Sequence, residues 1–416
     1  MKMSLVASVL YFHFVILSEA FGHTADLEDN TTIVYTPPFH ATHVRVGEAH
    51  SKPFWGYTAV PSGFLVLLVG VGVAIPVFSW AIYHFVKRQR RKRLRRRFFI
   101  QNGGDLLSSP SSRSTVGDQR IRLFEEEEIQ AATADYSSDR IIGQGGEGLV
   151  FKAMLKNGTV VAIKKALKVN KVSRECFINE IVILSNVEHR NIVRLFGFCL
   201  ETDHPFLIYE YIPNGDLYDL FHVRREEYLN SWEVRQTILR EVGEALKKLH
   251  SIPSQDSDGV VLHRDVKLAN ILMDVNHRTV LADFGFARIL GMGDNHVTMP
   301  RPFGSVGYMD PQMLQSGRYT EQSDIYSLGI VMAELITGER ASTDAHGSLG
   351  LGHYFARCVG KRRLFNLIDP RIRTNDNADE IQWFAEVAAA CLRQKWLDRP
   401  NMVQVVKAME GDRTPI

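Results

Sequence analysis

Two long apolar runs lie in the first quarter of the chain. The first, residues 5–17, follows a single lysine and ends in Ser18-Glu19-Ala20, a pattern typical of a secretory signal peptide over residues 1–20. An uncleaved anchor would carry the same run. The second, residues 63–83, has the roughly 20 apolar residues that a helix needs to cross a bilayer. We predict a transmembrane helix over residues 62–86.

A dense basic tract follows the second run. Residues 87–97 read KRQRRKRLRRR, nine basic residues in eleven, while the whole chain has a net charge of +2, so the remainder carries −7. Cations crowd this flank only, which predicts a single-pass type I protein with a cytoplasmic C-terminal part. An arginine tract could instead bind nucleic acid or a nuclear import receptor. Its position directly after the apolar run favours the plasma membrane and anionic lipid over nucleic acid.

The expected outer segment, residues 21–61, is short and poor in apolar periodicity, so we expect it to be disordered or dependent on a partner. It carries a glycosylation acceptor at Asn30, in Asn30-Thr31-Thr32. Gly70 and Ala74 form a small-residue pair that offers a face for a homodimer. All four cysteines follow the basic tract and none forms a CxxC pair, which predicts reduced thiols in a cytosolic domain.

Residues 87–136 are expected to form a basic juxtamembrane linker. Gly, Ser and Pro dominate residues 101–119, as in a flexible spacer. From Arg122, the stretch RLFEEEEIQAATADYSSDR predicts a helix whose acidic start suits the helix dipole. This helix leads into a domain that we place at residues 137–410, with a tail over residues 411–416.

A glycine-rich motif opens this domain. Residues 142–150 read IGQGGEGLV and place GxGxxG before a strand-like stretch, LVFKAML. Glycines let a backbone approach phosphates closely. In dinucleotide-binding folds the same motif opens a helix. The strand therefore favours a hairpin that covers a nucleotide, contacted by Ile142, Gly143, Gly145, Gly146, Gly148 and Val150.

A lysine ends the next predicted strand, GTVVAIKK. The cation of Lys164, in Val161-Ala162-Ile163-Lys164, is expected to hold the α- and β-phosphates of the nucleotide. Its expected partner is Glu180, at the middle of a helix predicted over residues 173–189. Glu175 is the rival acid, but it lies near the helix start, where an acid more often serves the dipole.

An apolar strand over residues 205–211 ends before the turn signal Pro213-Asn214-Gly215. Its position relative to the other motifs predicts the hinge between two lobes. Backbone groups near Glu210 and Tyr211 are expected to bond adenine, and Tyr209 to limit the pocket behind it.

The densest chemistry follows an amphipathic helix predicted over residues 232–250. Residues 263–270 read HRDVKLAN, and Asp283-Phe284-Gly285 comes a short hairpin later. Asp265 is expected to orient a hydroxyl and accept its proton, and Lys267 to neutralise the γ-phosphate. Asn270 and Asp283 supply oxygen ligands for Mg²⁺. This set predicts protein phosphorylation with ATP and Mg²⁺, and a lysine two positions after the aspartate is typical of the serine/threonine class.

Two further features are expected to control this loop. Arg264 can pair with a phosphate on the segment after Asp283, where Thr298 and Ser305 are the candidate acceptors. Ser305 could instead position the substrate. Asp324 is expected to brace the loop through backbone hydrogen bonds.

Together these residues resemble the plant receptor-like kinases. RFFIQNGG, IIGQGGEG, FINEIVILSNVEHRNIVRLFGFCLET and HVTMPRPFGSVGYMDP are similar to the wall-associated kinase-like branch over about residues 96–409. The resemblance implies an α+β fold of two lobes, a mainly antiparallel sheet with one key helix and a larger helical lobe. It also implies a plasma-membrane serine/threonine kinase that uses ATP and Mg²⁺, phosphorylates itself and protein substrates, and relays an external cue.

The chain departs from that family in two places. The family usually carries a cysteine-rich outer region, absent here, so a co-receptor is expected to supply ligand binding. Gln312 stands where an acid normally pairs with an arginine, and Arg399 is the matching arginine. We therefore expect a buried arginine without its countercharge and a less stable lobe. This departure is the one argument for an alternative function, a catalytically weak ATP-binding scaffold.

Overall fold

The computed structural model describes residues 62–107, 121–145, 148–167, 170–251, 260–291, 296–298, 304–342 and 350–414. The predicted signal peptide, the outer segment, Asn30 and Gly146 lie outside these ranges. Within them the chain forms one long N-terminal helix and a two-lobed domain.

The long helix is α2 (Ser62–Gln101), which contains Pro76. In the described part of the chain, one helix is long and apolar enough to cross a membrane, with a mean hydropathy of 1.7 over its apolar window. Proline is tolerated in membrane helices. The helix does not stop at the basic tract but continues through it to Gln101.

The first residues after the basic tract are packed rather than free. Asn102 is 2% exposed, and its Nδ2 donates to the carbonyls of Leu200 (3.0 Å) and Thr202 (2.8 Å). Leu107, in the short helix α3 (Gly104–Leu107), belongs to the main hydrophobic core. The composition of residues 101–119 predicts a flexible spacer, and for residues 101–107 that prediction is wrong, because two buried carbonyls and the core hold them in place.

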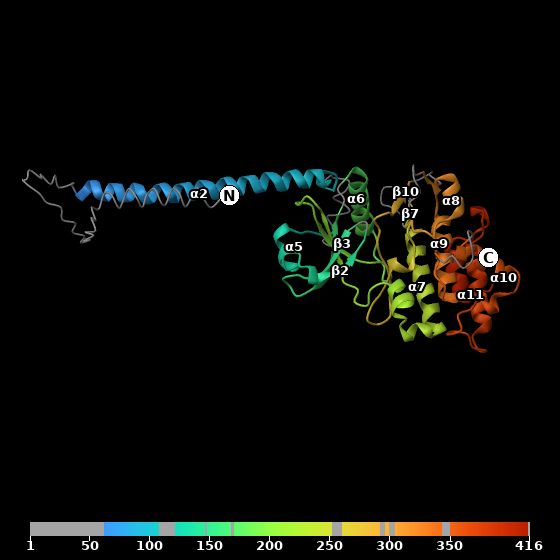
Figure 1. Cartoon of the computed structure of the whole chain (residues 1–416). Helices are drawn as coiled ribbons and strands as arrows, with labels where there is room; N and C mark the ends of the chain where they lie inside the picture. The colour runs from blue at the N-terminus through green and yellow to red at the C-terminus, as the bar shows by residue number, and fades with distance from the viewer. Residues whose placement is uncertain are drawn as a thin grey trace, which may run out of the picture. The chain divides into compact units, whose positions relative to one another are not determined.

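The smaller lobe is built on a six-stranded sheet in the order β1-β5-β6-β4-β3-β2, in which Figure 1 labels β2 and β3. All neighbours are antiparallel except β1 and β5. The strands are β1 (Arg122–Leu123), β2 (Ile141–Gln144), β3 (Gly148–Met154), β4 (Val160–Ala166), β5 (Leu195–Cys199) and β6 (Phe206–Glu210).

Two helices accompany this sheet. The helix α5 (Glu126–Ala132) begins with a capping box in which Glu125 and Glu128 satisfy each other's backbone N–H groups. The helix α6 (Lys171–Asn186) is capped by Asn170, whose side chain accepts from the N–H of Ser173. Both helices were expected from the sequence.

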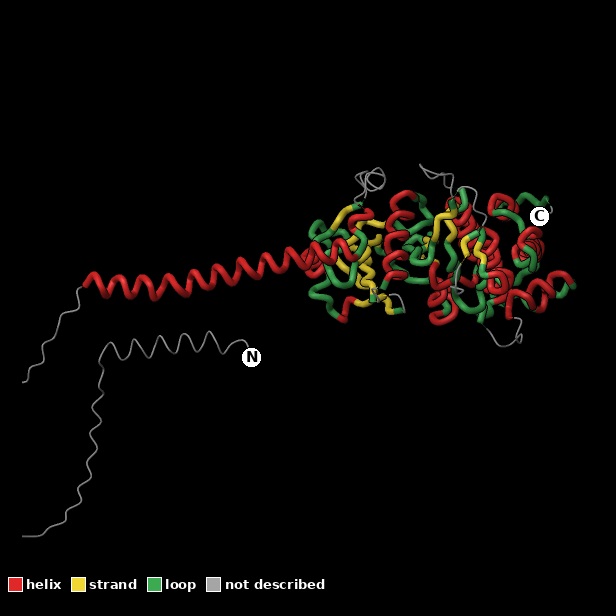
Figure 2. The backbone as a smooth tube through the Cα atoms, turned by 90° about the horizontal axis from the view of Figure 1, so that it is seen from above, coloured by secondary structure: helices red, strands yellow, loops and turns green. Residues whose placement is uncertain are grey.

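The larger lobe is mainly helical, as the red segments of Figure 2 show. Its helices are α7 (Trp232–Leu249), α8 (Pro311–Ser316), α9 (Glu321–Thr337), α10 (Gly350–Gly360), α11 (Ala378–Cys391) and α12 (Met402–Met409). Fifteen of the seventeen residues of α9 are buried, so this helix forms the centre of the lobe. The predicted α+β fold of two lobes is confirmed.

In the described part of the chain, three two-stranded sheets lie apart from the six-stranded sheet. β7 (Val260–Leu262) pairs with β10 (Arg288–Leu290), and β8 (Ile271–Met273) pairs with β9 (Thr279–Leu281). A third pair joins β11 (Val297–Thr298) to β12 (Arg318–Tyr319). The ends of these strands position the polar loops that the next section describes.

Candidate active site

The loop between β7 and β8 is held by a buried carboxylate from α9. Asp324 accepts hydrogen bonds from the backbone N–H of His263 and of Arg264, both at 2.8 Å, and from the ring of His250 at 3.0 Å. Arg264 has a φ of +72°, a conformation that is costly for a non-glycine residue. The two backbone bonds to Asp324 hold the loop in that conformation.

The carboxylate of Asp265 lies at the centre of this loop and is 5% exposed. Its Oδ2 accepts from Lys267 Nζ (2.6 Å) and Asn270 Nδ2 (3.0 Å), and its Oδ1 accepts from the hydroxyl of Ser305 (2.8 Å). Lys267 Nζ also donates to that hydroxyl at 2.8 Å. A hydroxyl therefore lies between a carboxylate and an ammonium, which is the environment that a reacting alcohol needs.

His263 supports the loop as a neutral ring. Its side chain is fully buried, and burial lowers its pKa. One ring nitrogen, Nδ1, accepts from the backbone N–H of Asp265 at 3.3 Å, and the other lies 3.2 Å from the carbonyl of Ala282. A neutral imidazole has one acceptor and one donor, which matches these two contacts.

Lys164 on β4 bridges the two lobes. Its Nζ lies 2.7 Å from Asp283 Oδ1 and 3.9 Å from Glu180 Oε2. Burial would raise the pKa of Asp283, but the charge of Lys164 and its hydrogen bond lower that pKa below its usual value. Asp283 has a φ of +63°, so its backbone is also strained at this position.

The structure brings Glu180, and not Glu175, to the lysine. Glu180 is buried on the inner face of α6, whereas Glu175 is exposed. The hydroxyl of Tyr209 donates to Glu180 Oε1 at 2.6 Å. Burial raises the pKa of Glu180, against the opposing effect of Lys164. The sequence places Tyr209 behind a pocket but does not reveal that it binds this carboxylate.

The oxygen donors of the site fit a hard divalent cation. Asn270 Nδ2 donates to the carbonyl and to Oδ2 of Asp265, which leaves Oδ1 as its ligand atom. The carboxylate of Asp283 is the second oxygen donor. The described residues contain no group of three or more His, Cys, Asp or Glu side chains arranged to hold a metal. Two protein ligands are typical of Mg²⁺, which keeps waters and phosphate oxygens as its other ligands.

The glycine-rich hairpin joins β2 to β3. The N–H of Gly145 donates to the carbonyl of Gly148 at 3.0 Å. A Cβ atom at Gly148 would overlap the carbonyl of Lys165 on β4, so this position requires glycine. Ile142 is exposed, and Gly143 and Val150 are half-buried.

The predicted hinge residues lie at the end of β6, where Glu210 is the last residue of the strand and Tyr211 follows it. The backbone N–H of Glu210 donates to the carbonyl of Arg194 at 3.0 Å, and its carboxylate accepts from the N–H of Arg194 at 2.9 Å. Tyr211 is half-buried, with Lys152 Nζ 4.6 Å from its ring centroid. Glu210 is thus fixed to the neighbouring strand, as a rigid hinge requires.

Comparison with known proteins agrees with this geometry. The protein kinase domain family matches residues 136–409. The chain belongs to the protein kinase family. This kinase is 38% identical over 357 residues to wall-associated receptor kinase-like 1 of Arabidopsis thaliana, covering 85% of this chain and 48% of that protein.

Two other plant receptor kinases are similarly related to this kinase. Wall-associated receptor kinase-like 3 of Arabidopsis thaliana is 39% identical over 354 residues, which is 85% of this chain and 47% of that protein. Wall-associated receptor kinase 3 of the same plant is 38% identical over 352 residues, with 84% and 47% covered. The chain spans about half the length of these curated relatives. The predicted resemblance to the wall-associated branch is confirmed.

Arg264 of the kinase carries unsatisfied donors. Its guanidinium is 1% exposed, donates from Nη1 to the carbonyl of Phe286 at 3.0 Å, and lies 5.2 Å from the ring centroid of Tyr319. Nε and Nη2 have no hydrogen-bond partner in the described part of the chain. Thr298 lies exposed in β11, and Ser305 is bound to Asp265 and Lys267 as described above.

The structure corrects one expectation about stability. Arg399 is not left without a countercharge, because Asp310 accepts from its Nη2 (2.7 Å, Oδ1) and Nη1 (2.8 Å, Oδ2). Both side chains are fully buried. Gln312 has a different role, since its Oε1 accepts from the backbone N–H of Trp396 at 2.8 Å. The expectation of a buried arginine without its countercharge is therefore wrong, and the reason for a less stable lobe goes with it.

Replacing Lys164 with alanine is expected to lower turnover of the kinase by about 10²-fold or more with little change in melting temperature. The lysine is the cation nearest Asp283, and Glu180 can take up a proton when that cation is removed. A thermal melt of the full chain in detergent, beside a phosphate-transfer assay, measures both quantities. A collapse of the melting curve would show instead that Lys164 is mainly structural.

Proposed function

We propose that this chain is a single-pass receptor-like serine/threonine kinase that transfers the γ-phosphate of ATP to protein hydroxyls, its own included. The observation that carries the proposal is the hydroxyl of Ser305 held between Asp265 and Lys267. This arrangement supports a site that binds the hydroxyl of a substrate beside a base and a cation.

The roles of the catalytic residues follow from their contacts. Asp265 orients the attacking hydroxyl and accepts its proton, and Lys267 neutralises charge that develops on the transferred group. Lys164, positioned by Glu180, binds the α- and β-phosphates. Asn270 and Asp283 would hold Mg²⁺, which would supply charge stabilisation to the transferred phosphate.

The nucleotide lies, in this proposal, under the glycine-rich hairpin and against the hinge. The hairpin residues Ile142, Gly143, Gly145, Gly148 and Val150 cover it, and their glycines let the backbone approach the phosphates. Glu210 and Tyr211 place backbone groups at the adenine. The close approach of the backbone that Gly148 permits supports this arrangement.

Phosphoamino acid analysis tests the proposal. The full chain in neutral-lipid nanodiscs is incubated with γ-labelled ATP and Mg²⁺, with and without excess EDTA. We expect labelled phosphoserine and phosphothreonine that EDTA abolishes, because metal removal takes away the phosphate clamp. Labelled phosphotyrosine alone would refute the serine/threonine class, and no label would refute kinase activity altogether.

Arg264 supports control of the kinase by phosphorylation. A phosphate has oxygens that match the two unsatisfied guanidinium donors, so a phosphorylated Thr298 or Ser305 would pair with Arg264 and order the loop around it. Of the two, Ser305 is engaged with the catalytic loop and suits substrate positioning, which leaves Thr298 as the favoured acceptor.

The N-terminal part of the chain supports a membrane location. We infer a plasma-membrane protein with the kinase domain in the cytoplasm, an outer segment served by a co-receptor or a second copy, and anionic lipid bound by the basic tract. Arg95 is the exception in that tract. It is half-buried and pairs with Glu127 and Glu126 (3.7 Å) of α5 and with Glu201 (3.9 Å) of the kinase domain.

The alternative of a catalytically weak scaffold has lost its support. It depended on an uncompensated Arg399, and Asp310 supplies that countercharge. The contacts of Lys164, Asp265, Asn270 and Asp283 support phosphate transfer instead.

A further inference from the structure

A large cavity opens on the helical lobe, next to the segment that follows Ser305. It has a volume of about 1300 Å³ and is lined by α8, α9, α10 and α11. Its rim includes Val306 and Gly307, which directly follow Ser305 in the chain. A segment of protein whose hydroxyl takes the place of the Ser305 hydroxyl would therefore reach this cavity with its neighbouring residues.

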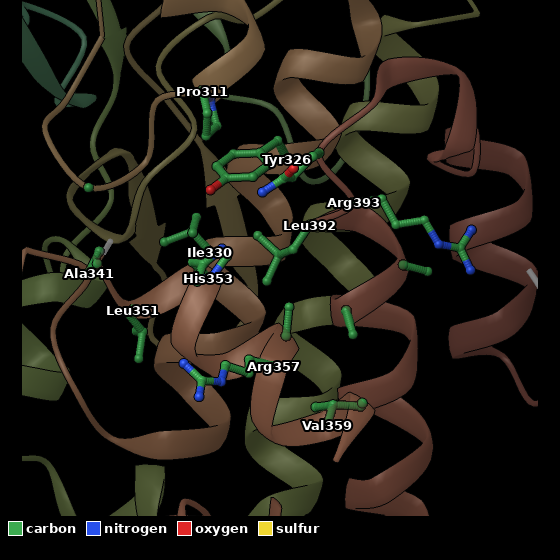
Figure 3. Close-up of a pocket in the computed structure, with 18 of the residues that line it drawn as sticks. Pro311, Tyr326, Ile330, Ala341, Leu351, His353, Arg357, Val359, Leu392 and Arg393 are labelled. Atoms are coloured by element: carbon green, nitrogen blue, oxygen red, sulfur yellow. The ribbon is translucent and has the colours of Figure 1, made fainter. Parts of the chain in front are cut away.

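The wall of the cavity is apolar. Tyr326 and Ile330 of α9 and Leu392 lie at its centre in Figure 3. Among its lining residues, Val306 is 75% exposed and Leu314 is 46% exposed, although both are apolar. Exposed apolar side chains that border a concave surface indicate a binding site. A cavity larger than the usual small-molecule pocket suits an extended peptide.

The rim of the cavity is positively charged. Its charged lining residues are Arg357, Arg393, Arg413 and a single acid, Glu386. Figure 3 shows Arg357 and Arg393 at the periphery, away from the apolar centre. Arg357 is exposed, and its guanidinium makes no hydrogen bond or ion pair with other described residues. Glu386 is held by Gln382 Nε2 at 2.9 Å. The charge of the rim therefore attracts carboxylates.

We propose that this cavity binds the part of a protein substrate that flanks the phosphorylated residue, and that it selects a flank with apolar and acidic side chains. The inference rests on the proposed function and adds the class of substrate. Continuity with Ser305 argues for a substrate over an unrelated ligand, and the basic rim sets the charge of the flank. Apolar side chains fill the centre, and carboxylates pair with Arg357 and its neighbours.

Three peptides of equal length test the proposal. They share one acceptor serine and the same apolar residues, and their flanks carry three glutamates, three glutamines or three lysines. The full chain is used in nanodiscs of neutral lipid, so that the basic tract recruits no peptide to an anionic surface. We expect kcat/KM to be at least about tenfold higher for the acidic peptide than for the lysine peptide, mainly through KM.

Two charge reversals complete the experiment. Arg357→Glu is expected to lower the ratio of kcat/KM between the acidic and lysine peptides by about fivefold or more. Arg362→Glu is the matched control, because Arg362 is also exposed but does not line the cavity, and it is expected to leave the ratio unchanged. Melting curves of both variants confirm that each is folded.

The outcomes separate the two levels of inference. Equal kcat/KM for all three peptides, or equal loss of preference in both variants, overturns the cavity as the substrate site while kinase activity stands. Phosphorylation of no peptide and no self-phosphorylation overturns the proposed function, and the cavity proposal with it. A second copy of the chain as occupant would show as a concentration-dependent dimer that Arg357→Glu disrupts without changing peptide preference, which also overturns the proposal.

Discussion

Replacing Asp265 with asparagine is expected to lower kcat for phosphate transfer by about 10²–10⁴-fold while the kinase keeps its fold. The change removes the proton acceptor and the charge that faces Lys267. It preserves the shape of the side chain. Asparagine Oδ1 can still accept from Lys267 and Asn270, and its amide can donate to the Ser305 hydroxyl, so every present contact of Asp265 keeps a partner.

The measurement is label incorporation under saturating ATP, beside a thermal melt with and without ATP and Mg²⁺. Retained stabilisation by nucleotide would show that the variant still binds it. Asp379→Asn is the matched control, because Asp379 is exposed on the first turn of α11 and undergoes the same chemical change. If Asp265→Asn incorporates phosphate at the rate of the unmodified kinase, the proposed base is wrong.

Local patterns were sufficient for most elements of the fold. The strands that carry Lys164 and Tyr209 and the helix that carries Glu180 lie where periodicity and the turn signals predict them. Each of these signals comes from neighbouring residues in one element. The position of Glu180 over Glu175 was also predictable, since only the former lies on the inner face of α6.

Contacts between distant segments could not be predicted in the same way. The bond from Tyr209 to Glu180, and the bridge that Ser305 makes to Asp265, join residues that no local pattern relates. Composition also misled for residues 101–107. Their glycines and polar side chains are typical of a linker, yet Asn102 satisfies two carbonyls that would otherwise be buried without donors.

The contact between distant residues also explains why the sequence predicted, wrongly, that Gln312 leaves Arg399 without a countercharge. A motif position indicates which residue usually pairs with Arg399, but the pairing itself depends on the direction of each side chain. Asp310 lies two residues earlier, at the N-cap of α8, and its carboxylate faces the guanidinium. The carboxylate that balances a buried arginine can therefore come from a nearby position in the chain.

Replacing Asp310 with alanine is expected to destabilise the kinase by about 3–5 kcal/mol, which corresponds to a fall in melting temperature of about 6–20 °C. The variant leaves the guanidinium of Arg399 buried without a countercharge. It also removes the acceptor of the indole N–H of Trp396 (2.6 Å) and the cap of α8 at the N–H of Gln312 (2.9 Å).

Two comparisons make this last prediction specific to the ion pair. Asp398→Ala removes an exposed acid next to Arg399 and is expected to shift the melting temperature by no more than about 2 °C. Gln312→Glu places a second acid near Arg399, whose charge Asp310 already balances. The new carboxylate can still accept from the N–H of Trp396, as the amide oxygen does now. This variant is therefore expected to bring no stabilisation. A stable Asp310→Ala variant together with a stabilised Gln312→Glu variant would show that Arg399 lacks a countercharge after all. A destabilised Asp310→Ala variant together with an unstabilised Gln312→Glu variant would show that Asp310, two positions before Gln312, is the countercharge of Arg399.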